Sequence, residues 1–446
     1  MSEKPYYPRI TAYPPGPRTR ELQIRDYKVT SPSLEKGFPL SIEYAEGPYL
    51  IDLDGNRYID LTSGWLTSNL GHRHPAIVRA IEEQAGKLIS FPYRRFYSQV
   101  VTELSEELAN IAPGASEKRV LLSASREDSI DAALKMVRWN TRRQVYLTHI
   151  GSYHGESIAA TSLTSDDARR RLHMPGLLTT VHIPFPYCYR CPLTKVGEPC
   201  RSLYCLQALE DALATVAPPQ DTAAFLLEPI QVYNGVIVPP DEYMRKLWRI
   251  LRDNGIPIIV NEGYTALGRT GSWFAVNHWS ITPEAVAMAE NLASGLPITA
   301  LVADRDLMDW YPGSHSTTLG GNPLAASAAL ATVKTVRDEN LMPNANREGL
   351  YMKKRVRELQ EELPCIGDIR GLGLLIGIEI IKTGGDREPD VENAKRIVRE
   401  CWRKGVVLDV CGKSTILVAP PINIGRETID LALEILEASI RRILEN

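Results

Sequence analysis

The chain has 446 residues, 44% of them hydrophobic, which is enough for two or three structural units that each bury a core. Its 51 basic and 54 acidic residues give a net charge of -3 without a long run of one sign, which argues against nucleic acid or a membrane surface as a partner. The N-terminus lacks the features of a signal peptide and no stretch reaches the roughly 18 apolar residues of a membrane helix, so we expect a cytoplasmic protein.

The first forty or so residues are rich in proline and arginine, which predicts an extended arm lying over another surface. Residues 45–60 follow, and Asp54-Gly55-Asn56 within them favours a hairpin turn. Apolar and polar residues alternate after this turn, so we expect short antiparallel strands here.

From about residue 75, predicted helices alternate with short runs rich in β-branched residues. The helices are expected at 75–87, 128–139 and 241–254, and the strands at 120–122, 144–148, 223–227 and 256–260. Strands separated by helices of this length indicate a mainly parallel sheet that is covered on both faces.

An alanine-rich helix is expected at 324–336, and the C-terminal part then mixes helices and short strands. The helices are expected at 346–363, 391–404 and 427–444, and the strands at 374–381 and 406–410. This pattern predicts a smaller α+β domain. We expect residues 1–60 to form an N-terminal arm and a small-domain segment, 61–325 a large domain, and 326–446 the C-terminal small domain.

Five short motifs occur along the chain. They are Gly71-His72-Arg73-His74-Pro75, Tyr153-His154-Gly155, Glu228-Pro229-Ile230-Gln231, Gly268-Arg269-Thr270-Gly271 and Thr318-Leu319-Gly320-Gly321-Asn322-Pro323. In this order and spacing they resemble the class III aminotransferases, which use pyridoxal phosphate (PLP). The resemblance implies fold type I: an α/β large domain on a mainly parallel sheet, plus a smaller α+β domain made from both chain ends.

The resemblance also implies which positions carry the chemistry, and Glu290 is the most informative of them. A PLP enzyme needs an amine that holds the cofactor covalently and moves protons. The family has a lysine at this position, whereas here Ala289 is followed by Glu290. A carboxylate cannot condense with an aldehyde, and no lysine lies between Lys246 and Lys334 to replace it.

Three further sites depart from the family pattern. Asn261 stands where the family has the aspartate that keeps the pyridine nitrogen protonated, and an amide carries no charge for that role. The phosphate-binding Ser-Gly-Ser/Thr segment reads Ser125-Arg126-Glu127, which brings a side chain and a carboxylate to a place where backbone should meet phosphate. Leu417 stands where the family has an arginine for the substrate carboxylate.

Other positions of the family's cofactor site are kept, among them Tyr153, which in the family stacks on the cofactor ring. Packing of the fold is the alternative reason for keeping them. The kept positions are Tyr153, His154, Gln231 and Thr318. Together with the altered segment Ser125, Arg126 and Glu127 they make up the vestigial cofactor positions. We therefore expect no cofactor at the PLP site and predict that aminotransferase activity has been lost.

Thr318 is kept, and in the family this threonine reaches the cofactor phosphate of the neighbouring subunit. The sequence therefore favours a non-catalytic or regulatory subunit, assembled as a homo-oligomer of at least two chains or as a hetero-oligomer with an active paralogue. One alternative is a self-assembling structural or ligand-binding protein whose altered pocket is closed by a polar plug of Arg126, Glu127, Glu290 and Tyr264. Another is an active aminotransferase or racemase-like enzyme with unusual cofactor use, such as noncovalent PLP.

Four of the seven cysteines lie within eighteen residues in a proline-rich segment. Cys188, Cys191, Cys200 and Cys205 follow a Cys-x2-Cys-x8-Cys-x4-Cys pattern. Four thiols at this spacing suit tetrahedral zinc, which would stabilise a loop without regular structure. Disulfides, an iron–sulfur cluster or reduced thiols packed in the loop are the alternatives.

Overall fold

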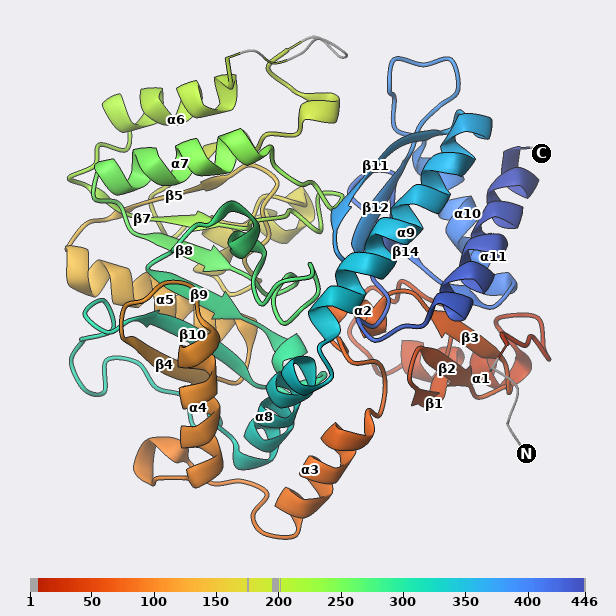
Figure 1. The fold of residues 1–446 in the computed structure, drawn as a ribbon, viewed down its shortest axis with the longest axis horizontal. Coiled ribbons are helices and arrows are strands. Elements are labelled where there is room, and N and C mark those ends of the chain that lie inside the picture. The colour runs from red at the N-terminus through yellow and green to blue at the C-terminus, as the bar shows by residue number, and fades with distance from the viewer. Residues whose placement is uncertain (1–6, 175, 195–199, 201, 445–446) are drawn as a thin grey trace.

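The computed structural model describes residues 7–174, 176–194, 200 and 202–444. A seven-stranded sheet forms the core of the larger part, and two four-stranded sheets lie in the smaller part beside it (Figure 1). None of the helices in the described residues is long and apolar enough to span a membrane.

The large sheet is mainly parallel. In spatial order its strands are β4 (Lys118–Ser123), β10 (Thr299–Asp304), β9 (Ala285–Met288), β8 (Ile258–Asn261), β7 (Thr222–Leu227), β5 (Val145–His149) and β6 (Thr180–Ile183). Strand β10 runs antiparallel to both of its neighbours, while the strands from β9 to β6 run parallel to one another. The expected α/β fold class is therefore confirmed.

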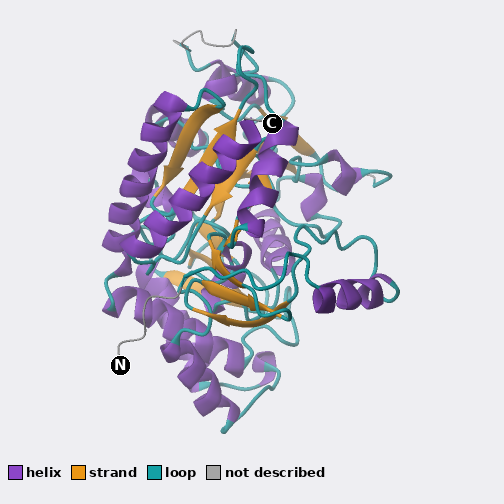
Figure 2. Ribbon diagram, turned by 90° about the vertical axis from the view of Figure 1, so that its right-hand side faces the viewer, coloured by secondary structure: helices purple, strands orange, loops and turns teal. Residues whose placement is uncertain are grey.

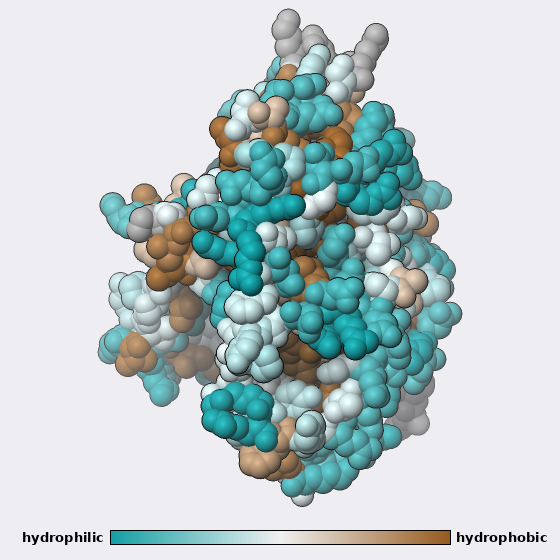
Figure 3. Space-filling view, turned by 90° about the vertical axis from the view of Figure 1, so that its left-hand side faces the viewer, coloured by the Kyte–Doolittle hydropathy of each residue, from teal (hydrophilic) through white to brown (hydrophobic). Residues whose placement is uncertain are grey.

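Every residue of β5 and β7 is buried, as expected for strands that are covered on both faces. Successive side chains of β7 enter opposite layers: Ala224 and Leu226 pack against α5 residues, whereas Phe225 and Leu227 join the core that contains α7 residues. The covering helices are α4 (Gln99–Ile111), α5 (Arg126–Thr141), α6 (Tyr204–Ala214) and α7 (Asp241–Asp253). On the side of α6 and α7, hydrophilic residues dominate the surface (Figure 3).

Both ends of the chain contribute to the smaller part. One sheet contains β1 (Ile42–Glu46), β2 (Tyr49–Asp52), β3 (Arg57–Asp60) and β13 (Val406–Val407), and the other contains β11 (Ile366–Leu372), β12 (Leu375–Ile380), β15 (Thr415–Val418) and β14 (Asp409–Cys411). Val406 pairs with Ile59 across a parallel ladder, so segments almost 350 residues apart share a sheet. Helices α9 (Leu341–Glu362), α10 (Val391–Arg403) and α11 (Arg426–Leu444) complete this part, and Figure 2 views the molecule from this side.

Helix α1 (Pro17–Tyr27) lies beside β1, β2 and β3 (Figure 1). The remaining α-helices are α2 (Ser63–Leu66), α3 (Pro75–Ala85) and α8 (Pro323–Asp338). Helix α8 packs against α3 and α4 and continues into α9, which leads from the larger part to the smaller one (Figure 1).

The N-terminal segment differs from its prediction because residues 17–27 form a helix rather than an extended arm. Pro17 occupies the first helical turn, where its missing N–H costs nothing, and the Asp54 carboxylate accepts hydrogen bonds from the backbone N–H groups of Arg18 and Thr19. The predicted hairpin is present, but its loop is longer than a two-residue turn. Asp52 closes it by accepting from the N–H groups of Asp54 and Asn56.

Candidate functional site

Side chains from several strands meet at one edge of the large sheet. Strands β4 and β9 both run antiparallel to β10, so their carboxyl ends lie at the same edge as those of β5, β7 and β8. Asn261 is the last residue of β8, and Arg126, Tyr153, Glu228 and Glu290 follow the ends of the other strands. In open α/β sheets, ligands bind at this edge.

Arg126 and Glu290 form an ion pair at the centre of the site. Arg126 begins α5 directly after Ser125, whose hydroxyl caps the helix by accepting from Asp128 N at 3.3 Å. The Arg126 side chain is buried, and its Nη2 lies 3.3 Å from Oε2 of Glu290. The carboxylate is more open to solvent, since 31% of the Glu290 side chain is exposed.

The guanidinium of Arg126 also lies over an aromatic ring. Its central carbon is 3.8 Å from the ring centroid of Tyr264 and 5.6 Å from that of Tyr153. A cation over a ring at such a distance is attracted by the negative face of the ring. These contacts agree with the predicted plug of Arg126, Glu290 and Tyr264, whereas Glu127 lies instead against Gly155.

Gly263 makes room for the buried arginine. A Cβ added at this glycine would lie 3.1 Å from the central guanidinium carbon of Arg126, and equally close to the Ala289 side chain. Such a contact is tighter than van der Waals packing allows without movement of its neighbours. The glycine after Glu262 therefore belongs to the same arrangement as the arginine at position 126.

Two more aromatic residues and a second arginine complete the surroundings, and the sequence patterns did not single them out. Tyr233 packs on Tyr153 with a centroid distance of 4.5 Å and stacks on Trp65 at 4.9 Å. Arg170 lies over Tyr153 at 4.9 Å and over Tyr233 at 5.2 Å. The position of Tyr233, two residues after the motif that ends at Gln231, is the one signal that could have indicated it.

Neighbouring groups favour the charged form of Arg126, but the hydrogen bonding of its side chain is incomplete. Burial lowers the pKa of the Arg126 guanidinium, yet Tyr264 and Glu290 raise that pKa above its ordinary value in net effect. Arg126 therefore stays charged. Its Nη1 has no hydrogen-bond partner within the described ranges, although a buried donor normally finds one.

Glu228 is a second buried carboxyl group beside this pair. Its Oε2 accepts from the N–H of Tyr153 at 3.1 Å and its Oε1 accepts from that of Val232 at 3.4 Å. Burial outweighs these bonds and raises the pKa of Glu228 to about 8. Glu228 is thus mainly protonated at neutral pH and adds little negative charge near Arg126.

Asn261 is held entirely by neighbouring protein groups. Its Nδ2 donates to the carbonyl of Tyr153 at 3.1 Å and lies 3.3 Å from Nδ1 of His154, while its Oδ1 accepts from Gly263 N at 3.2 Å. Burial lowers the pKa of His154 to about 3, so the imidazole is neutral and can accept through Nδ1. The amide therefore fixes the loop after β5 rather than pointing a free donor or charge into the site.

The other predicted positions have separate surroundings. Gln231 is buried and donates to the carbonyl of Ile150 and to Ser152 Oγ, both at 3.0 Å. Leu417 is fully buried on β15 in the hydrophobic core, which is consistent with a packing role. Thr318 is exposed on the loop that precedes α8.

The zinc prediction for Cys188, Cys191, Cys200 and Cys205 is wrong. In the described residues, which include all four cysteines, no group of three or more potential ligands is arranged to hold a metal ion, and the thiols are free. Cys205 lies in the first turn of α6 and is buried, and burial raises the pKa of its thiol to about 12. Cys205 packs in the hydrophobic core.

Comparisons with known proteins identify the family. The family model described as Aminotransferase class-III matches residues 30–440. The chain belongs to the class III aminotransferase family. It is 34% identical to an alanine/serine racemase of Pyrococcus horikoshii over 98% of this chain and 94% of that protein, and 35% identical to a leucine/methionine racemase of Thermococcus litoralis over 91% and 92%.

A solved structure corrects the expectation about the cofactor. The ornithine aminotransferase of Toxoplasma gondii is 26% identical, with a TM-score of 0.83 over 96% of this chain and 95% of that one, and it has PLP at partial occupancy in its active site. The expectation that the PLP site holds no cofactor is therefore wrong, because a structure with the same fold over nearly the whole chain holds PLP at this site.

The residues of this class III chain nevertheless do not fit covalently attached PLP. Glu290 provides no amine, and Asn261 has its amide engaged by Tyr153, His154 and Gly263. The buried Arg126 side chain fills space at the start of α5, where helix N–H groups would otherwise meet a phosphate.

Proposed function

We propose that this class III family member does not carry out lysine-dependent amino transfer or racemisation and acts as a non-catalytic subunit of an aminotransferase-like oligomer. The observation that supports this most strongly is the ion pair between Glu290 and Arg126. If position 290 is that of the family's reactive lysine, as the sequence motifs imply, a carboxylate stands there in place of the amine, and a buried cation neutralises it. Both changes oppose covalent attachment of an aldehyde cofactor.

The assembly we propose contains at least two chains, either identical or paired with an active paralogue. Thr318 supports the second form, because it is kept at a position that in the family serves the neighbouring subunit, and its side chain is exposed. Purification of the native complex tests this choice. A particle with a second class III subunit is expected, and a particle of identical chains would remove the hetero-oligomer.

Covalent attachment is tested by borohydride treatment in the presence of PLP followed by mass spectrometry, since borohydride makes an amine-bound PLP permanent. We expect no specific modification of the wild-type chain. The double variant R126G/E290K should carry one PLP at position 290, whereas E290K alone should carry much less because Arg126 still fills the site. Specific modification of the wild-type chain at a single lysine would overturn the proposal.

The second candidate function is an amino-acid racemase-like or aminotransferase-like enzyme that uses its cofactor without a covalent bond. The two racemases that resemble this chain along nearly its whole length favour it. In this candidate the partly exposed Glu290 carboxylate, rather than an amine, would move the proton of the substrate. Turnover that requires PLP and disappears in Glu290→Gln would establish this function and remove the first.

A further inference from the structure

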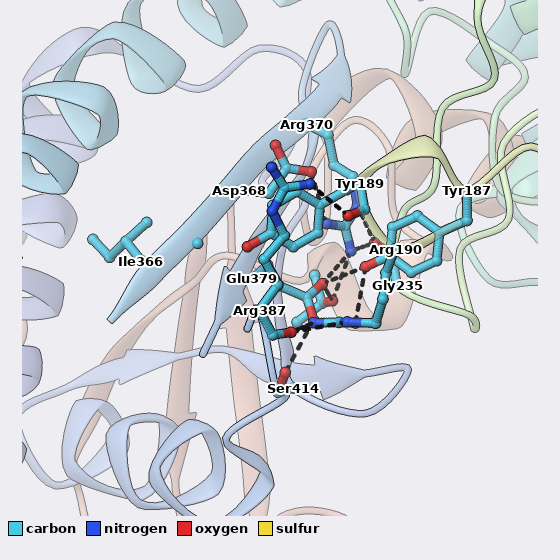
Figure 4. Close-up of polar contacts among 12 residues, drawn as sticks. Tyr187, Tyr189, Arg190, Gly235, Ile366, Asp368, Arg370, Glu379, Arg387 and Ser414 are labelled. Carbon is cyan, nitrogen blue, oxygen red and sulfur yellow. Dashed lines mark hydrogen bonds and ion pairs between the residues drawn. The ribbon is translucent and has the colours of Figure 1, made fainter. Parts of the chain in front are cut away.

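A buried carboxylate in the smaller part of the molecule joins three segments of the chain. Glu379 on β12 accepts hydrogen bonds from five side chains (Figure 4). The donors are Arg370 at 2.6 Å, Thr415 at 2.8 Å, Tyr187 and Arg190 at 2.9 Å, and Ser414 at 3.0 Å. Burial would raise the pKa of Glu379, but Arg370 and Arg190 lower it to about 2, so the group is ionised.

This network holds the segment around Tyr187 against the small-domain strands. Arg190 also donates to the carbonyl of Arg387, and Arg387 donates to the carbonyl of Tyr189, both at 2.9 Å. Arg370 donates in addition to the carbonyl of Gly235. These side chains are therefore held in place by bonds from several segments of the chain.

A cavity of about 540 Å³ opens beside the network, a size that is typical of small-molecule sites. Its lining has an apolar part and a polar part. The apolar residues are Ile150, Pro184, Phe185, Pro192 and Leu193, and the polar ones are Tyr187, Arg190, Asn234, Glu379, Lys413 and Thr415. Arg126 and Glu290 are not part of this lining, so the cavity is separate from the site described above.

The apolar side of the cavity is unusually open. Ile150 is 51% exposed and Leu193 is 41% exposed, and Phe185 lies buried behind them. Large apolar side chains that stay in contact with water at the mouth of a cavity gain stability when an apolar molecule covers them.

The polar side carries one excess positive charge. Glu379 is neutralised within the lining by Arg190, and Arg370 behind it is paired with Asp368 at 3.1 Å. Lys413 is exposed, and it makes no ion pair or hydrogen bond with any residue that the structure describes. An occupant with a single negative charge would therefore find one free cation, whereas the other charges of the lining are satisfied.

We propose that this cavity binds a small organic acid, with its carboxylate at Lys413 and its apolar body against Ile150, Phe185 and Leu193. One free ammonium group matches one carboxylate. The apolar wall disfavours small hydrophilic acids, and the unpaired ammonium of Lys413 favours a carboxylate over a neutral lipophilic molecule. The site does not depend on the proposed non-catalytic role, because its residues take no part in the Arg126 site.

The test is isothermal titration calorimetry of the full-length protein with decanoate, and with decanol as the uncharged probe. We expect saturable binding of one decanoate per chain and at least ten-fold weaker binding of decanol. Lys413→Met, which keeps an apolar side chain of similar length, should weaken decanoate binding about ten-fold and leave decanol unchanged. Lys395→Met, at an exposed lysine on α10, is the matched control and should change neither affinity.

A second variant tests whether decanoate binds in this cavity. Ile150→Trp adds bulk at the mouth and should abolish binding of decanoate, and circular dichroism will show that this half-exposed position tolerates the change. Absence of saturable decanoate binding to the wild-type protein would overturn the proposal. Binding that survives Ile150→Trp, or that is equally strong in Lys413→Met, would overturn it as well.

Discussion

Two arginine–carboxylate groups, one around Glu379 and one of Arg126 with Glu290, differ in how completely their hydrogen-bonding groups are satisfied. Glu379 is 1% exposed and accepts from five donors, so both charges of its pairs with Arg370 and Arg190 are bonded from several sides. The pair of Arg126 and Glu290 has a single contact of 3.3 Å and leaves Nη1 of Arg126 without a partner among the described residues.

This difference separates a scaffold from a site. A buried ion pair contributes to a stable fold only when its remaining hydrogen-bonding groups are satisfied, as they are around Glu379. The buried cation of Arg126 is less completely bonded, and the rings of Tyr264 and Tyr153 lie beside it. The Arg126 site is therefore held by fewer bonds than the network around Glu379.

The largest expected effect is at Glu379. Glu379→Gln removes the carboxylate that pairs with Arg190 and leaves Arg370 with Asp368 alone, so we expect the free energy of unfolding to fall by about 3–5 kcal/mol in chemical denaturation. Glu388→Gln, at an exposed carboxylate paired with Lys382, is the control and should change little. Equal losses of stability in Glu379→Gln and Glu388→Gln would refute the view that the network around Glu379 belongs to the scaffold.

The stability that the Glu379 network contributes should depend on pH. The folded-state pKa of Glu379 is about 2, against an ordinary value of 4.5, so its contribution to stability is present above pH 4.5 and disappears as the pH falls toward 2. The shift corresponds to about 3 kcal/mol. We therefore expect the stability difference between the wild-type protein and Glu379→Gln to shrink over this range. A difference that stays constant from pH 5 to pH 2.5 would contradict the assignment.

A smaller effect is expected in the class III site. Arg126→Ala removes the contact with the Tyr264 ring and one hydrogen bond to a partly exposed carboxylate, but it also removes a buried donor without a partner. We expect a loss of roughly 1 kcal/mol in the same denaturation experiment. A loss as large as that of Glu379→Gln would show that this pair is part of the scaffold.

The sequence predicts most of the large sheet, because continuous buried runs such as 223–227 distinguish strands covered on both faces. It misses β6, and also β9 and β10, where alanines weaken the strand signal. It also misses α1, whose opening prolines are equally typical of an extended segment. Glu290 and Arg126 are predicted to meet because the family places both positions in one site. The bonding of Glu379 to Arg190 was not predicted, since 189 positions separate them and neither belongs to a motif.

The central claim is that Glu290 stands in place of the family's lysine and cannot perform its chemistry. The most direct test measures racemisation of alanine and leucine by the wild-type protein with PLP, using chiral chromatography, beside the Pyrococcus horikoshii racemase as a positive control. We expect no turnover above that of free PLP. Turnover by the wild-type protein that Glu290→Gln abolishes would contradict the account and establish a working enzyme.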